Sequence, residues 1–334
     1  MNDLIRHLPA TADHVIVSAN PKAGARSGQP LVERLVELLR QRAYTVEVLT
    51  DIEQVAARSA ELHATHKLRA VVAAGGDGTV GLVVNKTVPG VPVAVLPLGT
   101  ENLLAKYLGV WADAEAVFQT IHAGISVRLD AGRAGERLFL LMLSCGFDAE
   151  VVRRLHNERQ GHIHHLSYAK PIFDAIRSYQ YPALRVYCEP ATEIESNRAE
   201  PNAVEAKPYT EARWAFVVNL PRYAVGLRIV PGAVGTDGLL DVCTFKEGSL
   251  WSGLLYLGGV LLEQHQSWSD CVTTRTRKLR IESSGEVPYQ LDGDPGGFLP
   301  VEIEVLPGRL TMLVPEAFVS EPAPAESLVL CPET

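Results

Sequence analysis

Residues 73–79 read Ala-Ala-Gly-Gly-Asp-Gly-Thr and directly follow the apolar stretch 68–72. A buried strand that ends in three glycines around one carboxylate predicts a close approach of backbone to a ligand, for which glycine also supplies positive φ. Exposed amides at the start of a following helix favour an anion such as phosphate. Because Asp77 would sit beside that phosphate, the pattern indicates a bridging cation and hence a metal–nucleotide complex. The alternative is a tight strand-to-helix turn that uses glycine for packing alone.

The loop is not a Walker A loop, because the Lys-Ser/Thr pair that closes that motif is absent after Gly78. Two similar loops follow other apolar strands: Asn20-Pro-Lys-Ala-Gly24 comes after 15–19, and Pro97-Leu-Gly-Thr-Glu-Asn102 comes after 91–96. Loops at the carboxyl ends of successive strands form the crevice in which open α/β sheets bind ligands. The loops together therefore predict a nucleotide site.

Three more motifs lie further along the chain: Gly146-Phe-Asp-Ala149, Asp237-Gly-Leu239 and Asp292-Gly-Asp294. In order and spacing, the whole set resembles the motifs of the soluble lipid kinases that include bacterial diacylglycerol kinases and sphingosine kinases, within the wider NAD kinase superfamily. The resemblance covers about residues 14–315. It implies an ATP-binding α/β domain, a β-rich second domain, ATP and Mg²⁺ as cofactors, and a membrane lipid as the acceptor of phosphate.

Local patterns predict the same two-part organisation. Strands are expected at 15–19, 44–49, 69–74 and 91–96, and helices at 31–39, 52–66, from 80 and at 102–108. This alternation predicts a parallel sheet with right-handed crossovers. Closely spaced strands follow at 126–131, 137–143, 184–188, 214–219, 240–245, 278–282 and 301–306. They predict an antiparallel β-sandwich.

We therefore expect an α/β N-terminal domain with a parallel sheet over 1–124 and a β-rich antiparallel sandwich domain over 125–320. The resemblance also implies a return of 309–320 to the first domain. The Pro- and Glu-rich segment 321–334 is predicted to be a disordered tail, and 189–213 a mobile hairpin insertion.

Bulk properties exclude some functions. A net charge of −8 argues against a nucleic-acid partner, because phosphate backbones require a concentrated basic face. Five scattered cysteines without a CxxC pair argue against a disulfide framework or a zinc cluster and suit a reducing cytoplasm. Residues 1–13 lack the apolar region of a signal peptide.

The predicted ATP-binding residues are Asn20, Pro21, Lys22, Ala23, Gly24, Gly75, Gly76, Asp77, Gly78, Thr79 and Thr100, and by resemblance Thr50. The amides of 75–79 would bind phosphate, with hydroxyl donors from Thr79 and Thr100. The alternative for Thr50 is the N-cap of the helix that begins at Ile52. Asp77 is predicted to ligate magnesium directly or through water, or else to form an Asx turn. As a solvent-facing loop residue, it is expected to contribute little to the core.

The metal and catalytic residues are carried over from the resemblance. A second magnesium would be held by the Asp237 side chain and the carbonyls of Val234 and Leu239, the alternative being an ordinary Asp-Gly turn. The family usually has Asp-Gly-Glu where this chain has Asp292-Gly-Asp294. Its last acid is the proposed general base for the lipid hydroxyl. We favour Asp294, although it is one methylene shorter, and keep Asp292 as the other candidate.

The sequence departs from the family at two other places. Val80-Gly-Leu82 stands where the family commonly has x-Asn-Glu, and Leu103 stands where diacylglycerol kinases typically carry Asp. These changes bear on the identity of the acceptor more than on the use of ATP. The favoured function is an ATP- and Mg²⁺-dependent lipid kinase acting on diacylglycerol. The alternatives are an NAD kinase-like enzyme, a kinase for sphingosine, ceramide or phosphatidylglycerol, and a nucleotide-binding sensor without turnover.

The acceptor would reside in a membrane, and two segments offer anchors. The apolar run 250–262 is too short for the ~20 residues of a membrane span, and 275–280 is basic. Together they predict a cytoplasmic protein that docks reversibly on the inner face of the membrane by apolar insertion and electrostatic attraction. The alternative is a buried helix beside a solvated strand. Whether two copies form a homodimer is left open.

Overall fold

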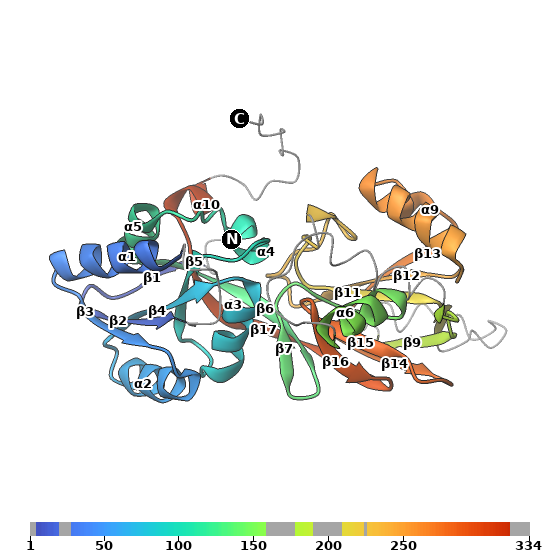
Figure 1. Ribbon diagram of the computed structural model, residues 1–334, viewed down its shortest axis with the longest axis horizontal. Coiled ribbons are helices and arrows are strands. Elements are labelled where there is room, and N and C mark those ends of the chain that lie inside the picture. Colours follow the sequence, from blue (N-terminus) through green and yellow to red (C-terminus); the bar gives the residue numbers. More distant parts are fainter. Residues whose placement is uncertain (1–4, 20–27, 158–177, 190–208, 224–225, 321–334) are drawn as a thin grey trace, which may run out of the picture. The chain divides into compact units, whose positions relative to one another are not determined.

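The computed structural model describes residues 5–19, 28–157, 178–189, 209–223 and 226–320. The predicted loop 20–24, the predicted tail 321–334 and most of the predicted insertion 189–213 lie outside these ranges. The chain divides into two compact units, residues 1–128 with 310–334 and residues 129–309. Each unit is a layered structure of its own (Figure 1).

The first unit is built on a parallel sheet in the order β17, β5, β4, β2, β3. The strands are β2 (His14–Ala19), β3 (Thr45–Leu49), β4 (Leu68–Gly75), β5 (Pro92–Pro97) and the end of β17 (Val301–Leu313). Every residue of β4 and β5 is buried, as expected for central strands of a parallel sheet covered on both faces. The chain passes from β3 on one side of β2 to β4 on the other, so the strand order reverses between β2 and β4.

Helices complete the first unit (Figure 1). They are α1 (Gln29–Gln41), α2 (Ile52–Ala64), α3 (Asp77–Lys86), α4 (Leu103–Leu108), α5 (Ala114–Ala123) and α10 (Glu316–Ser320). Helix α5 was not expected from the sequence. Its limits follow standard capping rules, because the Asp113 carboxylate accepts a hydrogen bond from the Ala116 N–H and Gly124 ends the helix in the left-handed region.

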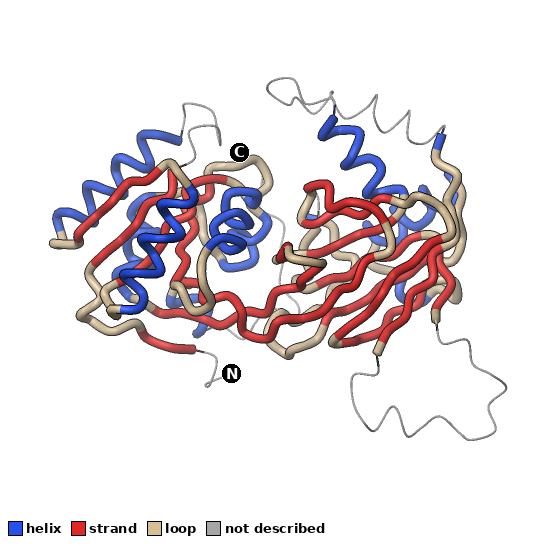
Figure 2. Tube along the Cα trace, turned by 90° about the horizontal axis from the view of Figure 1, so that it is seen from below, coloured by secondary structure: helices blue, strands red, loops and turns tan. Residues whose placement is uncertain are grey.

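The second unit packs two antiparallel sheets face to face; Figure 2 shows its strands in red. One sheet has the order β13 (Cys271–Thr276), β12 (Leu240–Phe245), β11 (Trp214–Val218), β8 (Met142–Cys145), β15 (Pro288–Leu291), β16 (Asp294–Phe298). The other contains β10 (Thr210–Ala212), β9 (Leu184–Cys188), β14 (Lys278–Ser283) and the start of β17, with β6 (Ile125–Ala134) and β7 (Arg137–Phe139) beside them. Strand β1 (Ile5–His7) pairs with the first residues of β6.

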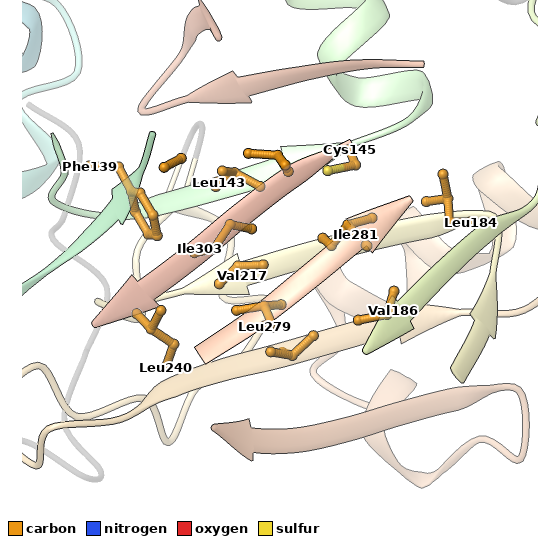
Figure 3. Close-up of a cluster of buried hydrophobic side chains, with 14 of the residues drawn as sticks. Phe139, Leu143, Cys145, Leu184, Val186, Val217, Leu240, Leu279, Ile281 and Ile303 are labelled. Carbon is orange, nitrogen blue, oxygen red and sulfur yellow. The ribbon is translucent and has the colours of Figure 1, made fainter. Parts of the chain in front are cut away.

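The core of this unit lies between the two sheets. Leu143, Val217 and Leu240 come from one sheet and meet Leu279 and Ile303 from the other (Figure 3). The described part of this unit also contains helices α6 (Phe147–Asn157) and α9 (Leu250–Leu261). The fold class predicted from the sequence, an α/β domain followed by an antiparallel sandwich, is confirmed. No helix among the described ranges is both long and apolar enough to cross a membrane.

Two predicted strands are wrong in detail. The single strand expected over 137–143 is divided into β7 and β8, because the Asp292 carboxylate accepts the N–H groups of Leu140, Leu141 and Met142. The basic run 275–280 does not form one strand either. Its first two residues belong to β13 of one sheet, and 278–280 belong to β14 of the other.

Candidate functional site

The turn between β4 and α3 contains the Gly-Gly-Asp-Gly-Thr sequence. A Cβ atom on Gly75 would lie 2.2 Å from Oγ1 of Thr79, so glycine is needed for the buried Thr79 side chain to pack against the strand. None of the three glycines adopts the left-handed region, and Gly76 has φ −89°. The expected positive φ is therefore wrong, and close approach is the reason for glycine. Gly78 alone faces open space, with no atom within 4 Å of an added Cβ.

The loop after β5 contacts this turn backbone to backbone. A Cβ on Gly99 would lie 2.6 Å from Cα of Gly76. Asn102 fixes the loop, since its Oδ1 accepts the Gly99 N–H at 3.0 Å and its Nδ2 donates to the Gly99 carbonyl at 2.8 Å. Thr100 is exposed between them. The structure thus brings together two of the loops that the sequence predicted to be neighbours.

The third loop, 20–24, lies outside the described residues. The strand before it, β2, ends beside β4. Ala19, the last residue of β2, pairs with Ala74 of β4. The carboxyl ends of β2 and β4 are therefore adjacent at the point where the strand order reverses, which is where open α/β sheets bind ligands.

The Asp77 carboxylate caps helix α4. Its two oxygens accept the N–H groups of Leu103 at 2.9 Å and Leu104 at 3.1 Å. The N-cap residue of α4, Asn102, makes no side-chain cap of its own. The expected Asx turn is not what Asp77 forms. Each carboxylate oxygen accepts one bond here and retains capacity for another partner.

Thr50 lies exposed at the end of β3, next to β2 in the sheet. The alternative role considered for it, the N-cap of α2, is wrong. That cap is Asp51, whose carboxylate accepts the Glu53 N–H at 2.9 Å. The Thr50 hydroxyl therefore does not cap α2.

The two acids of the Asp-Gly-Asp turn have different surroundings. Asp292 accepts three backbone N–H groups, from Leu140 at 2.6 Å and from Leu141 and Met142 at 2.9 Å. Asp294 begins β16, is partly exposed, and makes no side-chain hydrogen bond or ion pair with any described residue. Asp292 is thus committed to the backbone of the β7–β8 connection, while the Asp294 carboxylate is available.

A buried network of polar side chains, which was not predicted from the sequence, is hydrogen-bonded to the Asp-Gly-Asp turn. Asp148 of α6 accepts hydrogen bonds from the hydroxyls of Ser144 and Tyr223. Gln290 donates to the Ser144 hydroxyl at 2.9 Å and accepts the Gly293 N–H at 2.7 Å. Burial raises the pKa of Asp148, against the opposing effect of its hydrogen bonds. A signal for the network exists in the sequence, because Ser144 and Gln290 interrupt otherwise apolar strands.

The loop predicted to hold magnesium, 234–239, is fastened by another residue that the sequence analysis missed. Asp130 is buried in β6, and its carboxylate accepts the N–H groups of Gly238 at 2.7 Å and Gly308 at 2.6 Å. Its own N–H donates to the Gly235 carbonyl at 2.8 Å. The available signal was an acidic residue inside the predicted strand 126–131.

The Asp237 side chain in this loop already has two partners. One oxygen accepts the Leu239 N–H at 2.9 Å, and the other pairs with the Arg275 guanidinium. Burial raises the pKa of the nearby Asp241 to about 6, although Nε of Arg275 lies 3.5 Å from it. Within the described residues no three acidic, histidine or cysteine side chains gather as metal ligands. The donor set fits magnesium poorly in this arrangement, because Arg275 supplies the positive charge that a metal would bring.

Family comparisons agree with both units. Residues 14–134 match the diacylglycerol kinase catalytic domain, and residues 142–314 match the YegS C-terminal NAD kinase beta sandwich-like domain. Phosphotransfer to an alcohol group is the activity of these enzymes. The chain belongs to the diacylglycerol kinase/YegS family of lipid kinases.

Individual relatives are distant. A diacylglycerol kinase of Bacillus subtilis (strain 168) is 23% identical over 303 residues, 89% of this chain and 95% of that protein. The uncharacterized protein sll0036 of Synechocystis sp. (strain ATCC 27184 / PCC 6803 / Kazusa) is 29% identical over 251 residues, 73% of this chain. That match spans only about half, 54%, of the Synechocystis protein. The crystal structure of a diacylglycerol kinase from Bacillus anthracis str. Sterne shares the fold, with a TM-score of 0.63, 21% identity and coverage of 92% and 99% of the two chains.

Proposed function

We propose that this lipid kinase transfers the γ-phosphoryl group of ATP, taken as its magnesium complex, to the hydroxyl of diacylglycerol at the inner face of a membrane. The observation that carries the proposal is the backbone contact of Gly76 with Gly99. It joins the loops after β4 and β5 beside the end of β2, at the reversal of strand order, where α/β sheets bind nucleotides.

Phosphoryl transfer requires the nucleotide to be positioned and its charge to be neutralised, with little covalent chemistry from the protein. The first amides of α3 and the open space at Gly78 suit the phosphates. We assign Thr50, Thr100 and residues 20–24 to the same site. Magnesium that arrives with ATP would neutralise phosphate charge. The spare lone pairs of Asp77 can accept hydrogen bonds from its water ligands.

We assign the general base to Asp294. Its carboxylate has no competing partner among the described residues, whereas Asp292 already accepts three backbone N–H groups. Asp294 would take the proton of the acceptor hydroxyl as the hydroxyl oxygen bonds to the γ-phosphorus and ADP leaves. Gln290 positions the turn, because it binds the Gly293 N–H and is itself fixed through Ser144 to Asp148.

We propose diacylglycerol as the acceptor because of the family to which the chain belongs. The Bacillus subtilis relative is named for diacylglycerol, while Leu103 and the Val80-Gly-Leu82 segment depart from the usual pattern. The test is transfer from radiolabelled ATP to a panel of diacylglycerol, sphingosine, ceramide, phosphatidylglycerol and NAD, with and without Mg²⁺. We expect label in phosphatidic acid that depends on Mg²⁺. Label in another product would reassign the acceptor. ATP binding without transfer to any of them would indicate a nucleotide sensor.

A further inference from the structure

Helix α9 is drawn in orange in Figure 1. Most of its large apolar side chains are exposed. The exposed fractions are 78% for Trp251, 51% for Leu254, 60% for Leu255, 63% for Leu261 and 68% for Leu262, which follows the last helical residue. Most of these residues recur at spacings of three, four and seven, so they lie along one face of the helix. A contiguous exposed apolar face of this kind marks an interaction site.

The opposite face of α9 is built from glycines, Val260 and one anchoring tyrosine. A Cβ on Gly259 would lie 2.3 Å from the Trp268 ring, and a Cβ on Gly253 would lie 3.0 Å from the Trp214 ring. Tyr256 is buried, with its ring stacked 4.3 Å from that of Phe245. The small face therefore holds the helix in the unit. A helix selected only for packing would bury its leucines, and α9 does the reverse.

The charges on α9 and on the basic run 275–280 indicate whether this surface would bind a partner by apolar contact or by electrostatic attraction. No charged residue occurs between 250 and 262. In the basic run, Arg275 pairs with Asp237. Arg280 Nε lies 2.7 Å from Glu282, and Lys278 Nζ lies 4.0 Å from Glu189. The basic run is therefore largely neutralised within the fold and divided between two sheets, so it contributes less electrostatic attraction than the sequence suggests.

We propose that α9 is an interfacial helix that inserts the side chains of Trp251, Leu254, Leu255, Leu261 and Leu262 into the apolar layer of a lipid bilayer. The choice of a bilayer as its partner rests on the proposed function, because the acceptor is dissolved there. At twelve residues, or about 18 Å, the helix cannot span the ~30 Å hydrocarbon layer and lies in the membrane plane. Trp251 at its start suits the polar–apolar boundary. Because insertion is apolar, docking is predicted to resist salt.

The test is flotation with vesicles of phosphatidylcholine alone and of phosphatidylcholine with phosphatidylglycerol, in about 0.1 M and about 1 M NaCl, where the Debye lengths are roughly 10 and 3 Å. We expect binding to both vesicles at both salt concentrations. The triple variant Leu254→Gln, Leu255→Gln, Leu261→Gln should bind at least about tenfold more weakly. Vesicles should also shift tryptophan emission to the blue, and Trp251→Gln should remove most of that shift.

The matched control is Trp111→Gln, since Trp111 is 64% exposed but lies outside α9; it should bind like the wild type. Unchanged binding by the triple variant, a requirement for phosphatidylglycerol, or loss of binding in high salt would each overturn the proposal. So would a wild-type dimer that the triple variant converts to a monomer in light scattering while neither protein binds vesicles, because α9 would then be a subunit interface.

An activity measurement separates this inference from the proposed function. The triple variant should phosphorylate a short-chain diacylglycerol dissolved as monomers at the wild-type rate, and long-chain diacylglycerol in vesicles far more slowly. Equal loss on both acceptors would contradict a docking role. A wild-type protein that docks but phosphorylates neither acceptor would refute the proposed function and leave docking intact.

Discussion

The carboxylate of Asp77 accepts the backbone N–H of Leu103 at 2.9 Å, across 26 positions of sequence. The same side chain accepts the N–H of Leu104 from its other oxygen. A residue in the first turn of α3 thereby fixes the start of α4, whose residues Leu103, Leu104 and Leu108 are buried. Asp77 consequently has a structural role beside the one proposed for it with the nucleotide.

Asp77→Ala should therefore lower stability as well as activity. Removing the cap leaves two N–H groups without their acceptor, and we expect the free energy of unfolding to fall by about 1–3 kcal/mol. This revises the expectation from the sequence that the residue contributes little to the fold. Asp77→Asn keeps one acceptor oxygen and should lose less stability. Urea unfolding and ATP turnover of the two variants measure the effects separately.

Asp113→Ala is the matched control. Asp113 also caps a helix of the first unit, by accepting the Ala116 N–H at 2.8 Å, and its loss should cost about 1 kcal/mol. Phosphoryl transfer should survive in this variant and be abolished in Asp77→Ala. If both variants lose activity in proportion to stability, the nucleotide role of Asp77 is wrong.

Asp294→Asn and Asp292→Asn should give opposite results. Asp294→Asn cannot accept a proton, so kcat should fall by about 10²–10⁴-fold with the melting temperature and ATP affinity nearly unchanged. Asp292→Asn should chiefly reduce the melting temperature, because its carboxylate oxygens accept three N–H groups of residues 140–142. Steady-state kinetics and thermal melts on both variants decide which of the two residues is the general base. A low kcat in a fully stable Asp292→Asn protein would transfer the base to that residue.

The Arg275–Asp237 ion pair sets a condition on any magnesium bound by Val234, Asp237 and Leu239. The guanidinium and the metal would compete for the same carboxylate. Mg²⁺ in the absence of nucleotide should therefore raise the melting temperature of Arg275→Gln more than that of the wild type. The double variant with Asp237→Asn should lose this response. If Mg²⁺ stabilises Arg275→Gln and the double variant equally, the metal binds elsewhere.

Asp241 should make stability depend on pH. Burial raises its folded-state pKa to about 6, above the value of about 3.9 for an unfolded aspartate. Between these values the folded state holds the proton more tightly, so the contribution of Asp241 is complete below about pH 4 and lost as pH rises through about 6. Asp241→Asn carries no such charge. The free energy of unfolding of the wild type should decline relative to that of Asp241→Asn across this window, and parallel curves would contradict the assignment.

Much of the fold was predictable because its causes are local. The continuous apolar run 70–74 followed by glycines specifies a buried strand and a close turn, and this is the structure of β4 and its connection to α3. The switch from alternating helices and strands to closely spaced strands near residue 125 likewise predicted the change from an α/β fold to an antiparallel sandwich. Helix α5 was missed although Asp113 and Gly124 mark its limits.

The sequence by itself determined most strands of the parallel sheet, the glycine-rich loops and the lipid kinase family, since composition over a few residues encodes them. Only the tertiary structure decided that Asp292 is hydrogen-bonded to backbone N–H groups while the Asp294 carboxylate has no such partner among the described residues. Asp292 meets the N–H of Leu140 across 152 positions, and no local pattern encodes that contact. The same holds for the pairing of Asp237 with Arg275. It holds also for α9, because hydropathy gives the apolar content of a helix, whereas the face that packs against Trp214 and Trp268 determines which side chains remain exposed.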